Sequence, residues 1–209
     1  MPSVPIDTRG RKGYPVNGVL LPDEYHDKIA YTLILEEELQ RRVEEMAAQI
    51  TEDYCDKDLT AIIMTNGALV FGVDLLRSTR MLPWRLHTVA VRSYSGTEST
   101  GKAEIHATYR EQDIKDRNIL VIEDIIDTGN SMVRLLPELE KMNPRDLAVT
   151  ALLDKPSRRK NSTVDTFLRD VGFTIDNVFV VGYGLDFNYD YRWCEDLVVL
   201  KPKEYKEAL

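Results

Sequence analysis

The chain has 209 residues, a length that suits one α/β domain with a modest appendage. Its 35 acidic and 27 basic residues give a net charge of −8, which argues against sequence-independent nucleic-acid binding because such binding needs a basic face. The two cysteines lie far apart and cannot form a disulfide framework or a zinc site. Neither a signal peptide nor a membrane-spanning run is recognisable, so we expect a cytoplasmic protein without nucleic-acid or membrane partners.

The first third of the chain predicts an irregular arm followed by alternating helices and strands. Residues 1–18 are rich in proline, glycine and charge, and form the arm. Residues 35–54 carry apolar side chains at helical spacing, with acidic residues in the first turn where the helix dipole favours them. Residues 60–64 predict a buried strand, followed by the turn Thr65-Asn66-Gly67 and a helix over residues 68–76.

A long polar segment follows the next strand. Residues 86–91 predict that strand, and residues 92–116 then show no core-facing period and only weak strand alternation. A loop of this length in a compact domain is usually functional or disordered. We interpret the segment as a lid.

The most informative stretch runs from residue 118 to residue 132. Residues 119–122 are a short apolar run between turn signals, which is typical of a strand buried on both faces of a parallel sheet. Carboxylates, two isoleucines, a further carboxylate and Thr-Gly-Asn-Ser follow, and apolar residues then recur at helical spacing. The chain is therefore expected to leave a strand, make a tight polar turn and enter a helix.

A helix start offers unpaired N–H groups and a positive dipole end, which together favour a phosphate. Gly129 lets the backbone approach an anion, and Thr128 and Ser131 add hydroxyl donors. Three carboxylates nearby fit such a ligand only if it also carries hydroxyl groups, a transferable proton and a divalent cation, as a sugar phosphate with magnesium does. The alternative is an ordinary strand–helix corner capped by Asp127 or Thr128.

The remaining elements complete an α/β pattern. Strands are predicted over residues 146–153, 178–183 and 197–200. Strands that alternate with helices predict a doubly wound parallel sheet, with ligands bound at the carboxyl ends of the strands. The one dense basic cluster, residues 158–160, is interpreted as a solvated loop.

The string from Glu123 to Ser131 resembles the phosphoribosyl-diphosphate (PRPP) motif of type I phosphoribosyltransferases. Three further stretches agree with the hypoxanthine-guanine (6-oxopurine) branch of this family: Arg92-Ser93-Tyr94, Leu152 to Pro156, and Phe179 to Asp186 running on to Arg192. The resemblance covers most of residues 20–205. It implies the type I fold as a single domain over residues 1–209, with a core at about 36–182 and a small hood formed by the N-terminal arm and about 183–209.

The resemblance also implies roles in binding the purine and the pyrophosphate. Lys155 would donate to the exocyclic oxygen of a 6-oxopurine, Phe179 would stack on the base, and the main chain at Val180 would read the ring edge. Asp186 would lie at the base site and hold a second Mg²⁺ on the pyrophosphate. Arg192 and the loop Thr65, Asn66 and Gly67 would meet the pyrophosphate charge.

For the ribose phosphate, the resemblance implies that Glu123 and Asp124 accept from the ribose hydroxyls and hold a first Mg²⁺ largely through water. Asp127 would take or share the proton at purine N7 while N9 attacks. The turn would hold the 5′-phosphate through Ile126, Asp127, Thr128, Gly129, Asn130 and Ser131. A lid built on Ser93 and Tyr94 would keep water away from PRPP.

The expected function is therefore purine salvage: Mg²⁺-dependent transfer of a phosphoribosyl group from PRPP to hypoxanthine or guanine, by a homodimer or homotetramer. One position departs from the pattern, because many relatives place a lysine where this chain has Asn66. An alternative is a non-catalytic PRPP-sensing regulator, although such proteins usually carry a helix-turn-helix segment or a basic face. A P-loop kinase is excluded because the chain has no GxxxxGK[ST].

Overall fold

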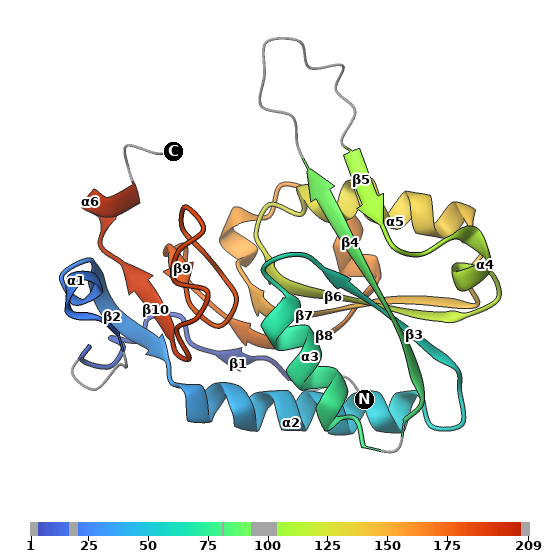
Figure 1. Cartoon of the computed structure of the whole chain (residues 1–209), viewed down its shortest axis with the longest axis horizontal. Coiled ribbons are helices and arrows are strands. Elements are labelled where there is room, and N and C mark those ends of the chain that lie inside the picture. The colour runs from blue at the N-terminus through green and yellow to red at the C-terminus, as the bar shows by residue number, and fades with distance from the viewer. Residues whose placement is uncertain (1–3, 17–20, 81, 93–103, 206–209) are drawn as a thin grey trace, which may run out of the picture.

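The computed structural model describes residues 4–16, 21–80, 82–92 and 104–205, which form a large sheet and a small one (Figure 1). The large sheet has seven strands in the order β1 (Ile6–Asp7), β8 (Leu168–Thr174), β7 (Asp146–Asp154), β6 (Asn118–Ile126), β3 (Leu59–Met64), β4 (Trp84–Arg92) and β5 (Glu104–Ala107). The small sheet has the order β2 (Ile29–Ile34), β10 (Leu197–Leu200) and β9 (Val180–Val181).

Helices cover both faces of the large sheet. The helices of the described residues are α1 (Asp23–His26), α2 (Glu36–Asp53), α3 (Leu69–Ser78), α4 (Glu111–Ile114), α5 (Asn130–Lys141) and α6 (Pro202–Tyr205), with short 3₁₀ helices η1 (Pro156–Arg158) and η2 (Thr163–Thr166), and α1 and α6 lie beside the small sheet (Figure 1). Helices α2 and α3 pack against each other on one face, and α5 lies on the opposite face (Figure 1). Within the described ranges, no helix combines the length and the apolar character that a membrane crossing requires.

The order of the strands locates the point at which ligands bind in such sheets. All neighbouring strands of the large sheet are parallel except β5, which pairs antiparallel with β4. From β3 the chain crosses through α3 to β4, and from β6 it crosses through α5 to β7 in the opposite direction. Right-handed crossovers of opposite direction place the two helices on opposite faces. The topological switch point therefore lies between the carboxyl ends of β3 and β6.

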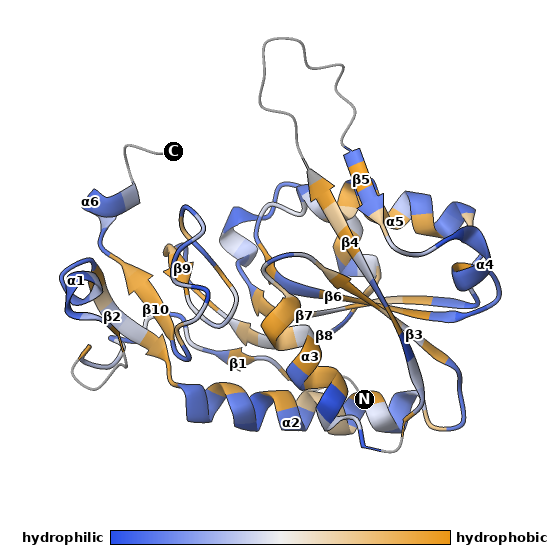
Figure 2. Cartoon of the chain, in the orientation of Figure 1, coloured by the Kyte–Doolittle hydropathy of each residue, from blue (hydrophilic) through white to orange (hydrophobic). Residues whose placement is uncertain are grey.

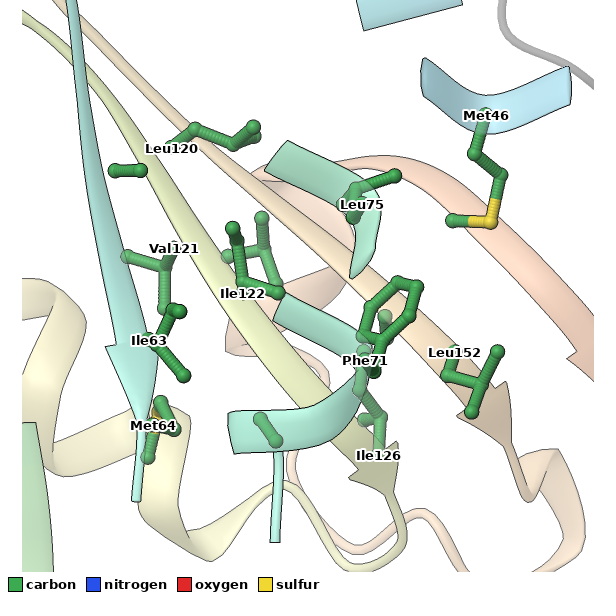
Figure 3. Packing of buried hydrophobic residues seen from close by; sticks show 14 of the residues in the cluster. Met46, Ile63, Met64, Phe71, Leu75, Leu120, Val121, Ile122, Ile126 and Leu152 are labelled. Atoms are coloured by element: carbon green, nitrogen blue, oxygen red, sulfur yellow. The ribbon is translucent and has the colours of Figure 1, made fainter. Parts of the chain in front are cut away.

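The core between α3 and the sheet holds these two strands in place. Phe71 and Leu75 of α3 are fully buried and lie over Ile122 and Ile126 of β6, as Figure 3 shows. Figure 2 shows the matching pattern, with the apolar residues gathered on the strands and on the inner faces of α2 and α5. Since every residue of β3 and the first six of β6 are buried, neither strand can slide without exposing apolar surface.

The doubly wound, mostly parallel sheet is confirmed. The predicted strand over residues 197–200 has the observed bounds, and the predicted helix over residues 35–54 is one residue longer at each end than α2. Strand β6 continues to Ile126, so Glu123 and Asp124 lie within the strand and do not follow it.

The structure adds detail to the expected arm, hood and lid segment. The N-terminal arm is not part of the hood alone, because β1 pairs with β8 in the large sheet while Tyr14 bridges to Thr32 of the small one. The small sheet of the hood also includes β2, which precedes the predicted core, and β9, which lies one residue inside the predicted core boundary at about 182. Within the predicted lid segment, residues Glu104–Ala107 form β5.

Candidate active site

The carboxyl ends of β3 and β6 carry the polar residues that the sequence singled out. Beyond β3 lies the turn Thr65-Asn66-Gly67, in which the Thr65–Asn66 peptide bond is cis. Strand β6 brings Glu123 and Asp124 to the same edge of the sheet. Both elements therefore deliver polar groups to the switch point.

Glu123, which is buried, and Asp124, which is half-buried, form a carboxylate pair that makes no salt bridge within the described part of the chain. Glu123 is 9% exposed, and its Oε2 has no hydrogen-bond partner. Burial, followed by the charge of Asp124, raises the pKa of Glu123 well above its ordinary value. Burial also raises the pKa of Asp124, although the N–H of Ile125, 2.8 Å from Asp124 Oδ1, and the charge of Arg192 oppose the shift. A cation or a hydroxyl donor at this place would satisfy both groups.

Close contacts at two glycines join the turn after β3 to Asp124 and to the hood. A Cβ on Gly67 would overlap Asp124 Oδ2, so only glycine fits there. Gly184, at a φ of +98°, lies so close to the Gly67 carbonyl oxygen that a Cβ would overlap it. Arg192 donates from Nη1 to the Gly184 carbonyl oxygen at 2.6 Å and pairs through Nη2 with Asp186 Oδ1 at 2.7 Å. The hood arginine is thereby held beside the β3 turn.

The turn between β6 and α5 encloses a small cavity. Gly129 precedes the first residue of α5 with a φ of +80°. The cavity has a volume of about 220 Å³ and is lined by Glu123, Ile125, Ile126, Asp127, Thr128, Gly129, Asn130, Ser131 and Met132. The cavity lies at the start of the twelve-residue helix α5. The unpaired N–H groups and the positive dipole end of a helix start favour an anion.

A larger cavity of about 420 Å³ adjoins it and shares two lining residues, Ile125 and Asp127. Its other lining residues are Asp124, Lys155, Arg158, Asn177, Val178, Phe179, Val180, Leu185, Asp186 and Tyr205. The larger cavity therefore combines apolar side chains, aromatic rings, and both positively and negatively charged groups. This composition suits a flat ligand that carries polar atoms on its edge.

The cavity holds one buried lysine. Lys155 is 6% exposed; burial lowers its pKa, while the neighbouring carboxylate of Asp127 opposes that shift. Asp127 itself accepts a hydrogen bond from Arg158 Nε at 3.0 Å. Lys155 as a donor and Asp127 as an acceptor thus line the same cavity.

Comparisons with known proteins agree with this geometry. Residues 32–188 match the family model described as "Phosphoribosyl transferase domain". The chain belongs to the phosphoribosyltransferase family. It is 36% identical over 181 residues to the hypoxanthine-guanine-xanthine phosphoribosyltransferase of Tritrichomonas foetus, covering 86% of this chain and 96% of that protein. It is 37% identical over 190 residues to the hypoxanthine-guanine phosphoribosyltransferase of Mycobacterium avium, covering 88% and 91%. A crystal structure of a hypoxanthine phosphoribosyltransferase from Staphylococcus aureus superposes with a TM-score of 0.79 at 33% identity, covering 88% of this chain and 98% of the other.

In this phosphoribosyltransferase most of the site residues proposed from sequence meet at the two cavities. Asp124, Asp127, Lys155, Phe179, Val180 and Asp186 line the larger one, while Glu123 and residues 126–131 line the smaller. Arg192 reaches the larger cavity indirectly, through its pair with Asp186. The predicted lid residues Ser93 and Tyr94 lie outside the described residues. The roles of these residues stay predictions.

Two residues of the phosphoribosyltransferase site were missed. Arg158 contacts Asp127 although it is exposed, as Lys160 is, which agrees with the solvated loop that we expected for the basic cluster. The adjoining Arg159 differs, because its side chain is largely buried and pairs with Asp154 and Asp165. Tyr205 stacks on Phe179 with ring centroids 4.7 Å apart and an interplanar angle of 23°. The signal for the arginines was the run of positive charge directly after Lys155. Nothing in the local sequence indicates Tyr205.

The predicted magnesium ligands do not converge on one point. In the described ranges, no group of three or more His, Cys, Asp or Glu residues could hold a metal ion. Glu123 and Asp124 are adjacent, and Asp186 is close enough to raise the pKa of Asp124 by charge repulsion. Such sparse donors fit Mg²⁺ only if water and ligand phosphates supply its other bonds, which is the coordination that this ion prefers. The unpartnered Oε2 of Glu123 is an available acceptor for such a hydrated ion.

We predict that Asp124→Asn stabilises the metal-free protein at pH 8 and stabilises it by a smaller amount at pH 4.5. The pKa of Asp124 is raised in the folded state, so the folded protein binds the proton more tightly than the unfolded chain. Wild-type stability therefore falls as pH rises through the range between the ordinary and the raised pKa, whereas asparagine does not titrate. The variant should gain about 1–3 kcal/mol over the wild type at pH 8.

Urea unfolding in the presence of a chelator, at pH 4.5 and at pH 8, measures this difference. Asp23→Asn, on the exposed surface of α1, is the matched control and should give the same difference from wild type at both pH values. A stability gain for Asp124→Asn that does not change with pH would contradict the assignment of the shift to this carboxyl.

Proposed function

We propose that the protein transfers the 5-phosphoribosyl group from PRPP to N9 of hypoxanthine or guanine and releases pyrophosphate. The observation that carries this proposal is the junction of the two cavities at Ile125 and Asp127. A ligand that fills both must have an anionic end at the start of α5 and a flat polar ring between Ile125 and Phe179. A purine nucleoside 5′-monophosphate, the product of this transfer, has both ends.

Base selectivity would depend on Lys155. An ammonium group only donates, so it favours a base with an oxygen at position 6 over one with an amino group there. Its burial strengthens this choice, because a buried ammonium that faces an amino group would be left without an acceptor. Phe179 would stack on one face of the ring, and Val180, which lines the same cavity, would meet the ring edge with its main chain.

In the transfer, the bond between C1′ and the pyrophosphate oxygen breaks and the bond between C1′ and N9 forms. The purine gives up a proton, which Asp127 would take or share at N7. Arg158 would have to release Asp127 for this contact, or to turn so that the second carboxylate oxygen is free. The buried carboxylates of Glu123 and Asp124 would accept from the ribose hydroxyls and stabilise the positive charge that develops on the sugar.

Mg²⁺ is the cofactor that we propose. Glu123 and Asp124 would hold one ion, largely through water, and Asp186 a second one. When bound, the ions would neutralise charge on the departing pyrophosphate. Arg192, held beside the β3 turn by Asp186 and Gly184, would add a fixed positive charge for the same leaving group.

A direct assay tests the proposal against the alternative of a PRPP-sensing regulator. Purified protein is incubated with PRPP, Mg²⁺ and hypoxanthine, guanine, xanthine or adenine in turn, and nucleotide and pyrophosphate are both measured. We expect IMP and GMP with equal amounts of pyrophosphate, no AMP, and no product when a chelator is present. Binding of PRPP without nucleotide formation would favour the regulator. Xanthine is included because the Tritrichomonas foetus relative is named for it.

Assembly and location remain proposals from sequence: a homodimer or homotetramer in the cytoplasm. Helix α3 presents a partly exposed apolar face, formed by Leu69, Val70 and Val73. Such a face next to the β3 turn is compatible with a subunit contact. Light scattering of the purified protein measures the oligomer.

Lys155→Ala should remove one charge-assisted hydrogen bond to the base. We expect kcat/KM for hypoxanthine and guanine to fall by a factor that corresponds to about 1.5–3 kcal/mol, while adenine stays a poor substrate. Lys141→Ala, an exposed position on α5, is the matched control. Unchanged kinetics with hypoxanthine would place the base elsewhere.

Asp127→Asn keeps the size of the side chain but removes the charge that accepts a proton. Turnover should fall about 10²–10⁴-fold, since a general base typically contributes that much. Equilibrium titration should show that PRPP still binds. A near-normal forward rate at neutral pH, with Asp23→Asn as the reference, would rule out this role.

Asn66→Lys restores the charge that many relatives carry in the turn after β3. A lysine there would add a positive charge near the pyrophosphate, partly screened by solvent and Mg²⁺. We expect the KM for PRPP to fall several-fold with kcat nearly constant, because such a contact forms equally in ground and transition states. Asn66→Gln is the uncharged control. If the KM is unchanged and light scattering detects a new oligomer, the side chain faces a subunit contact instead.

A further inference from the structure

The segment that follows Lys155 returns to the turn between β6 and α5 and contacts three of its residues. Arg158 Nε donates to Asp127, the backbone N–H groups of Lys160 and Asn161 both donate to the Thr128 carbonyl oxygen at 3.1 Å, and Asn161 Nδ2 donates to Asn130 Oδ1 at 2.7 Å. We call residues 158–161 the clamp segment, and residues 127–131 the phosphate turn. The contacts are successive along both segments.

The contact at Thr128 fixes the direction of a donor in the phosphate turn. In a planar trans peptide the C=O and the following N–H point in opposite directions. Two N–H groups hold the Thr128 carbonyl on the side of the clamp segment, so the N–H of Gly129 points away from that segment. The smaller cavity lies on that other side, since no residue of the clamp segment is among the described residues that line it.

Gly129 itself is in close contact with the clamp segment. A Cβ at this position would lie 2.6 Å from the Asn161 carbonyl oxygen and 3.5 Å from Asn161 Cβ. The backbone of Asn161 thus supports the turn from behind, at the residue whose positive φ starts α5. The turn cannot move toward the clamp segment without a clash.

The clamp segment is itself firmly attached. Arg159, whose side chain is 12% exposed, pairs with Asp154 at the end of β7 and with Asp165 of η2. Its Cδ also lies against the back of Gly129. The segment therefore connects the phosphate turn to the large sheet.

We propose that Asn161 is a positioning residue for phosphate binding: its side chain and backbone hold the phosphate turn in the shape that aims N–H groups into the smaller cavity before a ligand arrives. This inference rests on the proposed function, because it takes the 5′-phosphate as the ligand of that cavity. Preorganised donors cost no ordering when the anion binds, so their loss should weaken phosphate binding and spare the chemical step.

The test compares Asn161→Ala, Asn130→Ala and the double variant with wild type. Steady-state kinetics give the KM for PRPP, the KM for hypoxanthine and kcat, and calorimetry gives the affinity for ribose 5-phosphate without turnover. Ser162→Ala is the control, because Ser162 is the exposed neighbour and makes no side-chain capping bond to η2. Thermal unfolding of each variant measures any general loss of structure.

We expect Asn161→Ala to raise the KM for PRPP and the dissociation constant for ribose 5-phosphate by about three- to ten-fold, the range for one neutral hydrogen bond. The KM for hypoxanthine and kcat should stay close to wild type. Because Asn130 and Asn161 act as a pair, the double variant should lose no more than either single one. Ser162→Ala should match wild type.

Unchanged PRPP and ribose 5-phosphate binding in Asn161→Ala would overturn the inference, and so would an equal rise in both KM values together with a lower melting temperature. If wild type binds ribose 5-phosphate and Asn161→Ala weakens it, but no nucleotide forms with any purine, the proposed reaction fails and the role of Asn161 stands.

Discussion

The structure of this site depends on a pair of carboxylates buried at the carboxyl end of a central strand. Glu123 and Asp124 are adjacent in sequence. Burial raises the pKa of both carboxyls, and the neighbouring hydrogen bonds and charges do not offset that effect. Burial of such groups costs several kcal/mol unless it is offset. The offset here comes from the strand itself: β6 pairs with β3 and β7 along its length and is covered by α3, so the apolar residues around the pair hold it in place. A ligand that brings hydroxyl groups and a cation would relieve part of this cost, which links ligand affinity to the strain of the free protein.

Two glycines allow the turn after β3 and the hood to approach that pair. Gly67 gives Asp124 room in the turn after β3, and Gly184 lets the hood reach the same turn. A Cβ on Gly184 would meet the backbone of Gly67, whereas a Cβ on Gly67 would displace the side-chain carboxylate of Asp124. Tyr183 adds a second link between the hood and the core, since its hydroxyl donates to Asp74 of α3 at 2.8 Å. The hood is therefore attached to the core at Tyr183 and at Gly184, and Arg192 is held beside the turn after β3.

Sequence alone predicted the parts of this site that depend on local pattern. The switch from strand to helical period around Thr128 located the turn, whereas Lys155 and Phe179 were implied by the resemblance to the family. What could not be predicted depends on pairing across long separations. Strand β1 has two residues and hence no period, and β2 joins a sheet whose other strands lie more than 140 residues away. The pair of Arg158 with Asp127 spans 31 positions, and the stack of Tyr205 on Phe179 joins two parts of the hood. Such contacts are set by tertiary packing, which no local pattern encodes.

The segment after β7 shows how one short stretch can serve two ends of a ligand. Lys155 enters the larger cavity, Arg158 contacts the carboxylate at the junction, and Asn161 supports the turn around the smaller cavity. These three residues lie within a stretch that is anchored to β7 through Arg159 and Asp154. Arg159 anchors the stretch between Lys155 and Asn161. A substitution at Lys155 can therefore alter the larger cavity while Asn161 keeps its contacts with the turn. With the base and the 5′-phosphate bound as we propose, a change in base selectivity would leave the phosphate turn unchanged, since separate side chains on one fixed backbone would contact the two ends of the ligand.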